Sequence, residues 1–414
     1  METIEAANVV EMQEPKEALE EILRGGARQM LQQAIEGEVA DYLAKHHAAV
    51  DKHGRRLVVG NGRMPQRELT TGIGPLPVKQ PRVRDRRDGS KFTSTILPPY
   101  MRRLPSVDAL IPALYLKGVS TGDFSEALSA ILGRDAPGLS ATNVVRLKAQ
   151  WKDEYEAWQQ RDLSDRHYVY LWADGVYFKV RLSDERPCIL VLIGALPDGT
   201  KELVAVWDGE RESRLSWKEV LLDLKRRGLP SLPKLAIGDG ALGFWGALRE
   251  VFPTTREQRC WVHKTANVLD KMPKKIQPAA KRLIHEMYLA ETKNDALEAF
   301  EHFGELYGVK FRKAWDCLKK DQDQLFTFYD FPAEHWMHLR TTNPIESTFA
   351  TVRLRTRRTK GCGSRTATLM MVFKLADQAE KHWRRLNGSS RIAQVIEGVK
   401  FVDGIHPEEK KEAA

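Results

Sequence analysis

An acidic residue in the middle of an apolar run constrains the fold of this chain more than any other feature. Residues 168–182 are rich in β-branched and aromatic side chains, which is typical of a buried strand, yet the run contains Asp174 followed by Gly175. Burying an unpaired carboxylate is costly. Asp174 must therefore be paired, protonated or bound to a cation.

Two further acids occupy comparable places. Asp239 ends the apolar run 235–240, and Glu346 lies at the start of a strongly basic predicted helix. A single Asp after an apolar strand is commonly a turn residue or a helix cap. Three carboxylates at strand and helix ends can instead hold two divalent cations about 4 Å apart. Because Mg²⁺ prefers oxygen ligands, we expect two Mg²⁺ (or Mn²⁺) ions per active site, bound by Asp174, Asp239 and Glu346.

The order of the predicted elements gives the acids a common location. Residues 165–259 alternate between strand and helix patterns. The expected order is β-β-β-α-β-α-β, from strands 168–182, 188–195 and 201–207, helix 213–227, strand 235–238, helix 241–251 and strand 254–259. This is the order of the ribonuclease H-like fold, in which strand ends bring Asp174 and Asp239 together.

A chain of 414 residues is long enough for several domains. We expect an α+β multidomain protein in which a ribonuclease H-like α/β core is interrupted by an all-α insertion and preceded by helical DNA-binding modules. The predicted parts are an acidic helix (1–50), a small basic extended module (51–104), a helix-turn-helix (105–160), the first part of the core (165–259), the insertion (260–340), the final core helices (341–386) and a C-terminal tail (387–414). The first helix either packs on its own chain or dimerises.

The distribution of charge favours a polyanionic partner. Residues 1–45 carry ten acids against four bases, residues 79–103 carry two against eight, and residues 340–386 carry three against eleven. Such basic blocks are either solvated surface or phosphate-binding sites. The candidate DNA-contact residues are Arg82, Arg84, Arg86 and Arg87 in the extended module, Asn143, Arg146 and Lys148 on the third helix of the helix-turn-helix, and Arg353, Arg357 and Lys360 on the helix that follows Glu346.

Four widely spaced cysteines, Cys188, Cys260, Cys317 and Cys362, form no disulfide framework. They favour a reducing compartment. The chain also shows no apolar run of membrane-spanning length. We therefore expect a cytoplasmic protein without a membrane partner.

Four sequence blocks carry a resemblance to a known family. They are Trp-Ala-Asp-Gly-Val-Tyr-Phe at 172–178, Ile-Gly-Asp-Gly-Ala at 237–241, Arg-Cys-Trp-Val-His-Lys-Thr-Ala-Asn-Val at 259–268 and Thr-Asn-Pro-Ile-Glu-Ser-Thr-Phe-Ala-Thr-Val-Arg at 342–353. Over roughly residues 15–400 the chain resembles the bacterial insertion-sequence transposases of the Mutator type, which are DDE transposases. The resemblance implies that Asp174, Asp239 and Glu346 are catalytic. It also implies that the long interval between the last two is a helical insertion.

Three residues near these acids have open roles. Cys260 and His263 match the family's Cys-x-x-His signature, and we expect them to shape the site, with direct DNA contact as the alternative. A zinc site with His335 and His338 is not expected, because two such distant pairs have no zinc-module spacing. Trp336 either packs in the core or stabilises a flipped base, a role that aromatic residues take in related transposases.

The resemblance implies a metal-dependent DNA transposase that acts as a homodimer or larger assembly and associates with the bacterial nucleoid. It would bind terminal inverted repeats, cleave one strand and join the freed 3′-hydroxyl to target DNA. The sequence leaves open whether transposition follows a copy-out, paste-in route or a cut-and-paste route. The alternatives are a structure-selective nuclease of the same fold and a non-catalytic, transposase-derived DNA-binding regulator.

Overall fold

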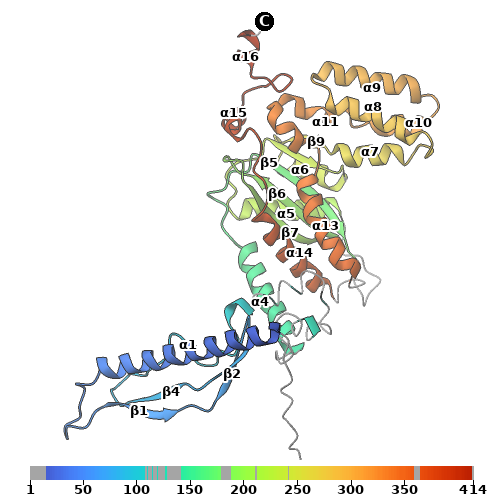
Figure 1. The fold of residues 1–414 in the computed structure, drawn as a ribbon. Coiled ribbons are helices and arrows are strands. Elements are labelled where there is room, and N and C mark those ends of the chain that lie inside the picture. Colours follow the sequence, from blue (N-terminus) through green and yellow to red (C-terminus); the bar gives the residue numbers. More distant parts are fainter. Residues whose placement is uncertain are drawn as a thin grey trace, which may run out of the picture. The chain divides into compact units, whose positions relative to one another are not determined.

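Figure 1 shows the fold of the chain as a computed structural model. It describes residues 15–107, 110, 114, 119, 126–127, 141–178, 188–209, 212–240, 242–358 and 364–412. The chain divides into two compact units, Met1–Leu147 and Lys148–Ala414.

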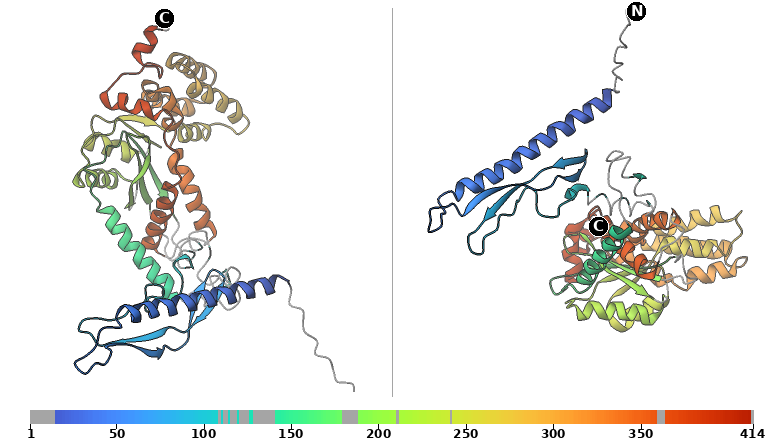
Figure 2. Two further views of the ribbon diagram at one scale, coloured as in Figure 1. Left: turned by 60° about the vertical axis from the view of Figure 1, so that its left-hand side comes forward. Right: turned by 90° about the horizontal axis from the view of Figure 1, so that it is seen from below.

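The N-terminal unit is built on one long helix beside two antiparallel strand pairs. Helix α1 (Pro15–Lys45) continues through Gly25 and Gly26 and runs alongside the strands (Figures 1 and 2). The strand pairs are β1 (Val58–Arg63) with β4 (Pro81–Asp85), and β2 (Arg67–Thr71) with β3 (Gly74–Val78). Their small core consists of Ile35, Leu69, Val78 and Leu97. Most of the expected helix-turn-helix lies outside the described residues; helix α4 (Ala141–Gln159) is its described part.

The second unit contains a five-stranded mixed sheet of order β7-β6-β5-β8-β9. Its strands are β5 (Tyr170–Tyr177), β6 (Cys188–Ala195), β7 (Lys201–Gly209), β8 (Leu235–Gly238) and β9 (Arg256–Arg259). The first three are antiparallel, and β5, β8 and β9 are parallel. Ala173 on β5 pairs with Gly238 on the parallel strand β8. Asp174 and Asp239 each follow one of these two paired residues, so both lie toward the same end of the parallel strands.

Helices cover both faces of this sheet (Figure 1). Alternate residues of β5, Leu171 and Ala173, join a buried cluster with α5 (Arg214–Arg226) and α6 (Leu242–Val251). The opposite face meets α13 (Asn343–Arg358) and α14 (Arg365–Glu380). Because side chains alternate along a strand, Asp174 belongs to the α13 face and Gly175 to the α5 face.

A helical insertion separates β9 from α13. It comprises α7 (Trp261–Leu269), α8 (Gln277–Leu289), α9 (Lys293–Tyr307), α10 (Arg312–Lys319), α11 (Gln322–Leu325), η1 (Thr327–Asp330), η2 (Ala333–His335) and α12 (Trp336–Leu339). The amphipathic pattern of residues 311–328 predicts one continuous helix, and this prediction is wrong, because α10 ends at Lys319. The chain leaves the helical conformation at Asp321, whose carboxylate binds Lys264 and Arg259.

The C-terminal segment contains three short helices that the sequence pattern did not predict. They are η3 (Ser389–Arg391), α15 (Ile392–Glu397) and α16 (Pro407–Glu412). Across the described part of the chain, no helix combines the length and the apolar character needed to span a membrane.

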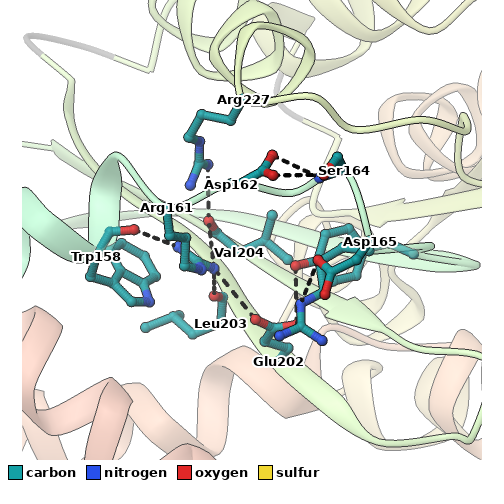
Figure 3. Close-up of polar contacts among 11 residues, drawn as sticks. Trp158, Arg161, Asp162, Ser164, Asp165, Glu202, Leu203, Val204 and Arg227 are labelled. Atoms are coloured by element: carbon teal, nitrogen blue, oxygen red, sulfur yellow. Dashed lines mark hydrogen bonds and ion pairs between the residues drawn. The ribbon is translucent and has the colours of Figure 1, made fainter.

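The edge strand β7 contains a β-bulge whose backbone carbonyls accept hydrogen bonds from arginine side chains (Figure 3). The register between β6 and β7 shifts so that Val204 is the extra residue. Its carbonyl accepts from Arg227 Nη2 at 3.3 Å, while Arg161 Nη2 donates to Leu203 O at 2.7 Å. Arg161 also lies over the Trp158 ring, with 4.2 Å between guanidinium carbon and ring centroid. The end of α4 therefore covers an edge that would otherwise expose strand carbonyls.

Candidate active site

The three predicted acids converge at the end of the sheet where β8 finishes. Asp174 is only 5 % exposed. Its pKa is raised to about 7, chiefly by burial and also by the negative charges of Asp239 and Glu346, while His263 and Arg353 act in the opposite direction. These five side chains, from β5, the end of β8, α13 and α7, are therefore close enough to influence one another electrostatically.

Glu346 is presented by the first turn of α13. Pro344 suits this position because its fixed φ is compatible with a helix start. The Glu346 backbone N–H donates to Thr342 O at 3.1 Å, and its Oε1 accepts from Thr342 Oγ1 at 3.3 Å. The first turn of α13 therefore positions the Glu346 carboxylate at the site.

Cys260 and His263 lie directly beside Glu346, as the site-shaping hypothesis requires. Cys260 Sγ accepts from the backbone N–H and the Oγ1 of Thr342, both at 3.4 Å, and lies 3.3 Å from His263 Nδ1. This contact, followed by the charges of Cys260, Asp174 and Asp239, raises the pKa of His263 to about 9 against the effect of burial. Burial alone would raise the pKa of the Cys260 thiol. The hydrogen bond and the charge of His263 have a larger combined effect, so the pKa is lowered.

The two other histidines considered for zinc are engaged elsewhere. His335 Nδ1 lies 2.8 Å from the Tyr170 hydroxyl and Nε2 lies 2.9 Å from Gly388 O. His338 Nε2 accepts from the Asn387 backbone N–H at 3.2 Å. Within the described residues, Cys260, His263 and Glu346 place three donor atoms within 4.8 Å of one another, without either of these histidines.

The turn after Asp239 is held by Arg259. Gly240 has a φ of +87°, in the left-handed region that favours glycine. The Arg259 guanidinium occupies the space that a Cβ at Gly240 would need. Arg259 is 5 % exposed, and its Nε lies 3.2 Å from Asp321 Oδ2. The second acid is thus followed by a turn that is tied to the helical insertion.

A fourth carboxylate, Glu212, is close enough to Asp174 and Asp239 for their charges to affect it. The sequence pattern does not predict it as a site residue. Glu212 immediately precedes Ser213, the N-cap of α5. Its pKa is raised to about 8, chiefly by burial and also by the charges of Asp239 and Asp174. The signal that could have revealed it is Gly175, because a glycine inside a strand marks the close approach of another group.

The candidate DNA-contact residues fall into three groups. Arg82, Arg84 and Arg86 are exposed, and so is Arg353 on α13. Arg87 instead pairs with Asp85 through two guanidinium nitrogens, at 3.0 and 2.7 Å, and donates to Tyr42. The described residues do not include the side chains of the remaining candidates, Asn143, Arg146, Lys148, Arg357 and Lys360.

Trp336 packs in the core of its unit. It is 7 % exposed, and its indole N–H donates to Phe331 O at 2.8 Å. Its ring meets Phe328 and Tyr329 edge-on. Of the two roles considered for Trp336, this geometry favours packing.

Comparison with known proteins places this chain in a family. The model described as "Transposase, Mutator family" matches residues 1–386. The chain is 55 % identical over 295 residues (71 % of this chain, 91 % of the relative) to the transposase for insertion sequence element IS6120 of Mycolicibacterium smegmatis. It is 50 % identical over 287 residues (68 % and 95 %) to the transposase for insertion sequence element IST2 of Acidithiobacillus ferrooxidans. It is 30 % identical over 295 residues (70 % and 73 %) to the transposase for IS256 in transposon Tn4001 of Staphylococcus aureus. The chain belongs to the Mutator family of transposases.

Proposed function

We propose that this protein is a DNA transposase that cleaves one strand at the end of its insertion sequence and transfers the freed 3′-hydroxyl to target DNA. The observation that carries the proposal is the convergence of Asp174, Asp239 and Glu346 from three elements that are distant in sequence. Both steps are in-line displacements at phosphorus, so a single site serves both. The family membership supports the same conclusion.

We propose a ribonuclease H-like core for this unit. The support is the sheet order β7-β6-β5-β8-β9, with three antiparallel strands followed by two parallel ones. It agrees with the order expected from the sequence. A helix-turn-helix before α4 stays part of the proposal and rests on the sequence pattern.

The acids suit a hard divalent cation. Asp174, Asp239 and Glu346 offer only oxygen ligands, and the cost of burying Asp174 in its charged form is what a bound cation would offset. These residues would hold Mg²⁺ or Mn²⁺, which supplies activation of the attacking hydroxyl and stabilisation of the leaving oxygen. His263 keeps Glu346 in place, and Arg353 provides a positive charge beside the acids.

DNA is the proposed partner, with terminal inverted repeats as its specific form. Exposed Arg82, Arg84 and Arg86 in the N-terminal unit are suited to phosphate contact. We propose assembly as a homodimer or larger complex on DNA, with α1 as the candidate dimerisation helix. Its residues Leu19, Ile22, Leu23 and Met30 are each more than half exposed within their own unit.

The experiment is cleavage and strand transfer of labelled terminal-repeat DNA by the purified chain with Mg²⁺ or Mn²⁺. Asp174→Asn, Asp239→Asn and Glu346→Gln should abolish both reactions. Glu301→Gln removes an exposed carboxylate of α9 and serves as the matched control. Wild-type cleavage by the three acid variants would refute the proposal. Cleavage without strand transfer would indicate a nuclease, and repeat binding without cleavage a regulator.

A further inference from the structure

The Glu212 carboxylate occupies a space that Gly175 leaves open on the α5 face of β5, next to the strand position that carries Asp174. A Cβ at Gly175 would lie 2.7 Å from Cδ of Glu212 and 3.0 Å from each of its carboxylate oxygens. Any larger residue would therefore displace this carboxylate. Gly175 directly follows Asp174 on β5, so the space belongs to the strand that carries the first acid.

A second glycine fixes the backbone of Glu212. A Cβ at Gly243, in the first turn of α6, would lie 3.0 Å from Glu212 O and 2.7 Å from the carbonyl carbon of Ser213. The start of α6 follows the Asp239 turn by a few residues. Glu212 is thus held between the strand that carries Asp174 and the helix that follows Asp239, and both contacts are too close for a side chain.

The Trp217 side chain and the charge of His263 favour the charged form of Glu212, but they do not satisfy its carboxylate fully. Its Oε1 is inaccessible to solvent and has no hydrogen-bond partner among the residues that the structure describes. The charges of Asp239 and Asp174 act on it unfavourably. A partly buried carboxylate beside two like charges is either protonated or compensated by a cation.

We propose that Glu212 is a fourth carboxylate ligand of the divalent-cation site. The inference rests on the proposed function of Asp174, Asp239 and Glu346. Charge balance supports it, because three carboxylates do not neutralise two divalent cations and four do. The Asp-Gly pair on β5 then has two functions, since Asp174 supplies one ligand and Gly175 admits another.

The test is Mn²⁺ binding to the full-length protein without DNA, measured by titration calorimetry and by electron paramagnetic resonance of free Mn²⁺. Glu212→Gln should lose one of the bound ions or bind Mn²⁺ at least about tenfold more weakly. Glu219→Gln, which removes an exposed carboxylate from α5, should bind Mn²⁺ like the parent. Parental stoichiometry and affinity in Glu212→Gln would overturn the inference.

Gly175→Ala supplies a second variant that leaves Glu212 intact. It should displace the carboxylate and weaken Mn²⁺ binding, and the Gly175→Ala, Glu212→Gln double variant should bind hardly more weakly than either single variant. Fully additive losses would contradict the inference, because they would mean that the two residues act separately.

Asp174→Asn separates this inference from the proposed function. Loss of Mn²⁺ binding in Asp174→Asn together with parental binding in Glu212→Gln would remove Glu212 from the site and leave the three acids. Parental Mn²⁺ binding in Asp174→Asn would instead refute the metal site itself, and the role of Glu212 with it.

Discussion

His263 Nδ1 lies 3.7 Å from Glu346 Oε1, and the same nitrogen lies 3.3 Å from Cys260 Sγ. The first residue of α7 follows Cys260, and Glu346 lies in the first turn of α13. The contact therefore joins the two ends of the helical insertion at the site. We propose that through this contact the Cys-x-x-His pair orients the third acid.

Replacing His263 should weaken the site without unfolding the protein. Residues that orient metal ligands typically contribute 10–100-fold to metal affinity or activity, and we expect a loss of about this size for His263→Ala. The measurement is cleavage rate as a function of Mn²⁺ concentration, in which the half-saturating concentration should rise. His302→Ala, an exposed histidine of α9, is the control. An unchanged Mn²⁺ dependence in His263→Ala would argue against the positioning role.

The metal-free protein should lose stability as the pH rises through the range from about 4 to 7. Burial raises the pKa of Asp174 from 3.8 to about 7, so in this window the folded state binds a proton that the unfolded state has released. The contribution of Asp174 to stability therefore decreases with rising pH, by up to about 4 kcal/mol. Thermal unfolding in EDTA between pH 4 and 8 measures it.

Asp174→Asn should reduce this pH dependence, leaving the part that comes from Glu212 and Glu380, whose pKa values burial also raises, and should match or exceed the parent in stability at pH 8 without metal. Saturating Mg²⁺ should restore the stability of the parent and leave that of the variant unchanged. A marked destabilisation of metal-free Asp174→Asn would instead show that Asp174 has a structural role.

Gly240→Ala should be more destabilising than the φ angle alone explains. Gly240 and Gly398 have nearly equal φ angles of +87° and +88°, but Gly398 has no atom within 4 Å of a Cβ position, whereas Gly240 meets the Arg259 guanidinium. We expect about 1 kcal/mol for Gly398→Ala and about 2–4 kcal/mol for Gly240→Ala, together with loss of cleavage. Urea unfolding of both variants measures the difference. Equal losses would show that Arg259 moves aside at no cost.

Removing the exposed arginines of the N-terminal unit should change the salt dependence of DNA binding. Arg82→Ala, Arg84→Ala and Arg86→Ala should each reduce the slope of log K against log salt by about 1 if each contacts one phosphate. Arg87→Ala should leave the slope unchanged and lower stability, because Arg87 bonds to Asp85 and Tyr42. Fluorescence anisotropy across a salt series measures the slope, and a parental slope in all three variants would exclude these phosphate contacts.

The sequence predicts those features of the site that a short run of neighbouring residues determines. A charge inside an apolar run made Asp174 conspicuous, and Asp239 ended a similar run. The pairing of Ala173 with Gly238 then brings the two acids to one edge. The third acid, Glu346, is predicted from its position at the start of a basic helix and from the family resemblance.

Features that depend on tertiary contacts were not accessible. Glu212 lies just before a helix cap, where no periodicity distinguishes it from any other polar residue. The interruption near Asp321 escaped for a related reason. The amphipathic pattern continues across this position, and the chain departs from the helix where Asp321 binds Lys264 and Arg259, which are distant in sequence.

The carbonyl of Leu325 is one of the groups through which the insertion returns to the sheet at β9. Leu325 O accepts from the Gln258 side chain at 3.0 Å and from the Trp261 indole at 2.9 Å. Closing an interval of this length as an unstructured loop would carry a large entropic cost, and a folded insertion lowers it. A nascent chain that has emerged only through β9 therefore has two of the acids but no means of placing the third. On the proposed function, an incompletely synthesised protein cannot cut the genome that encodes it.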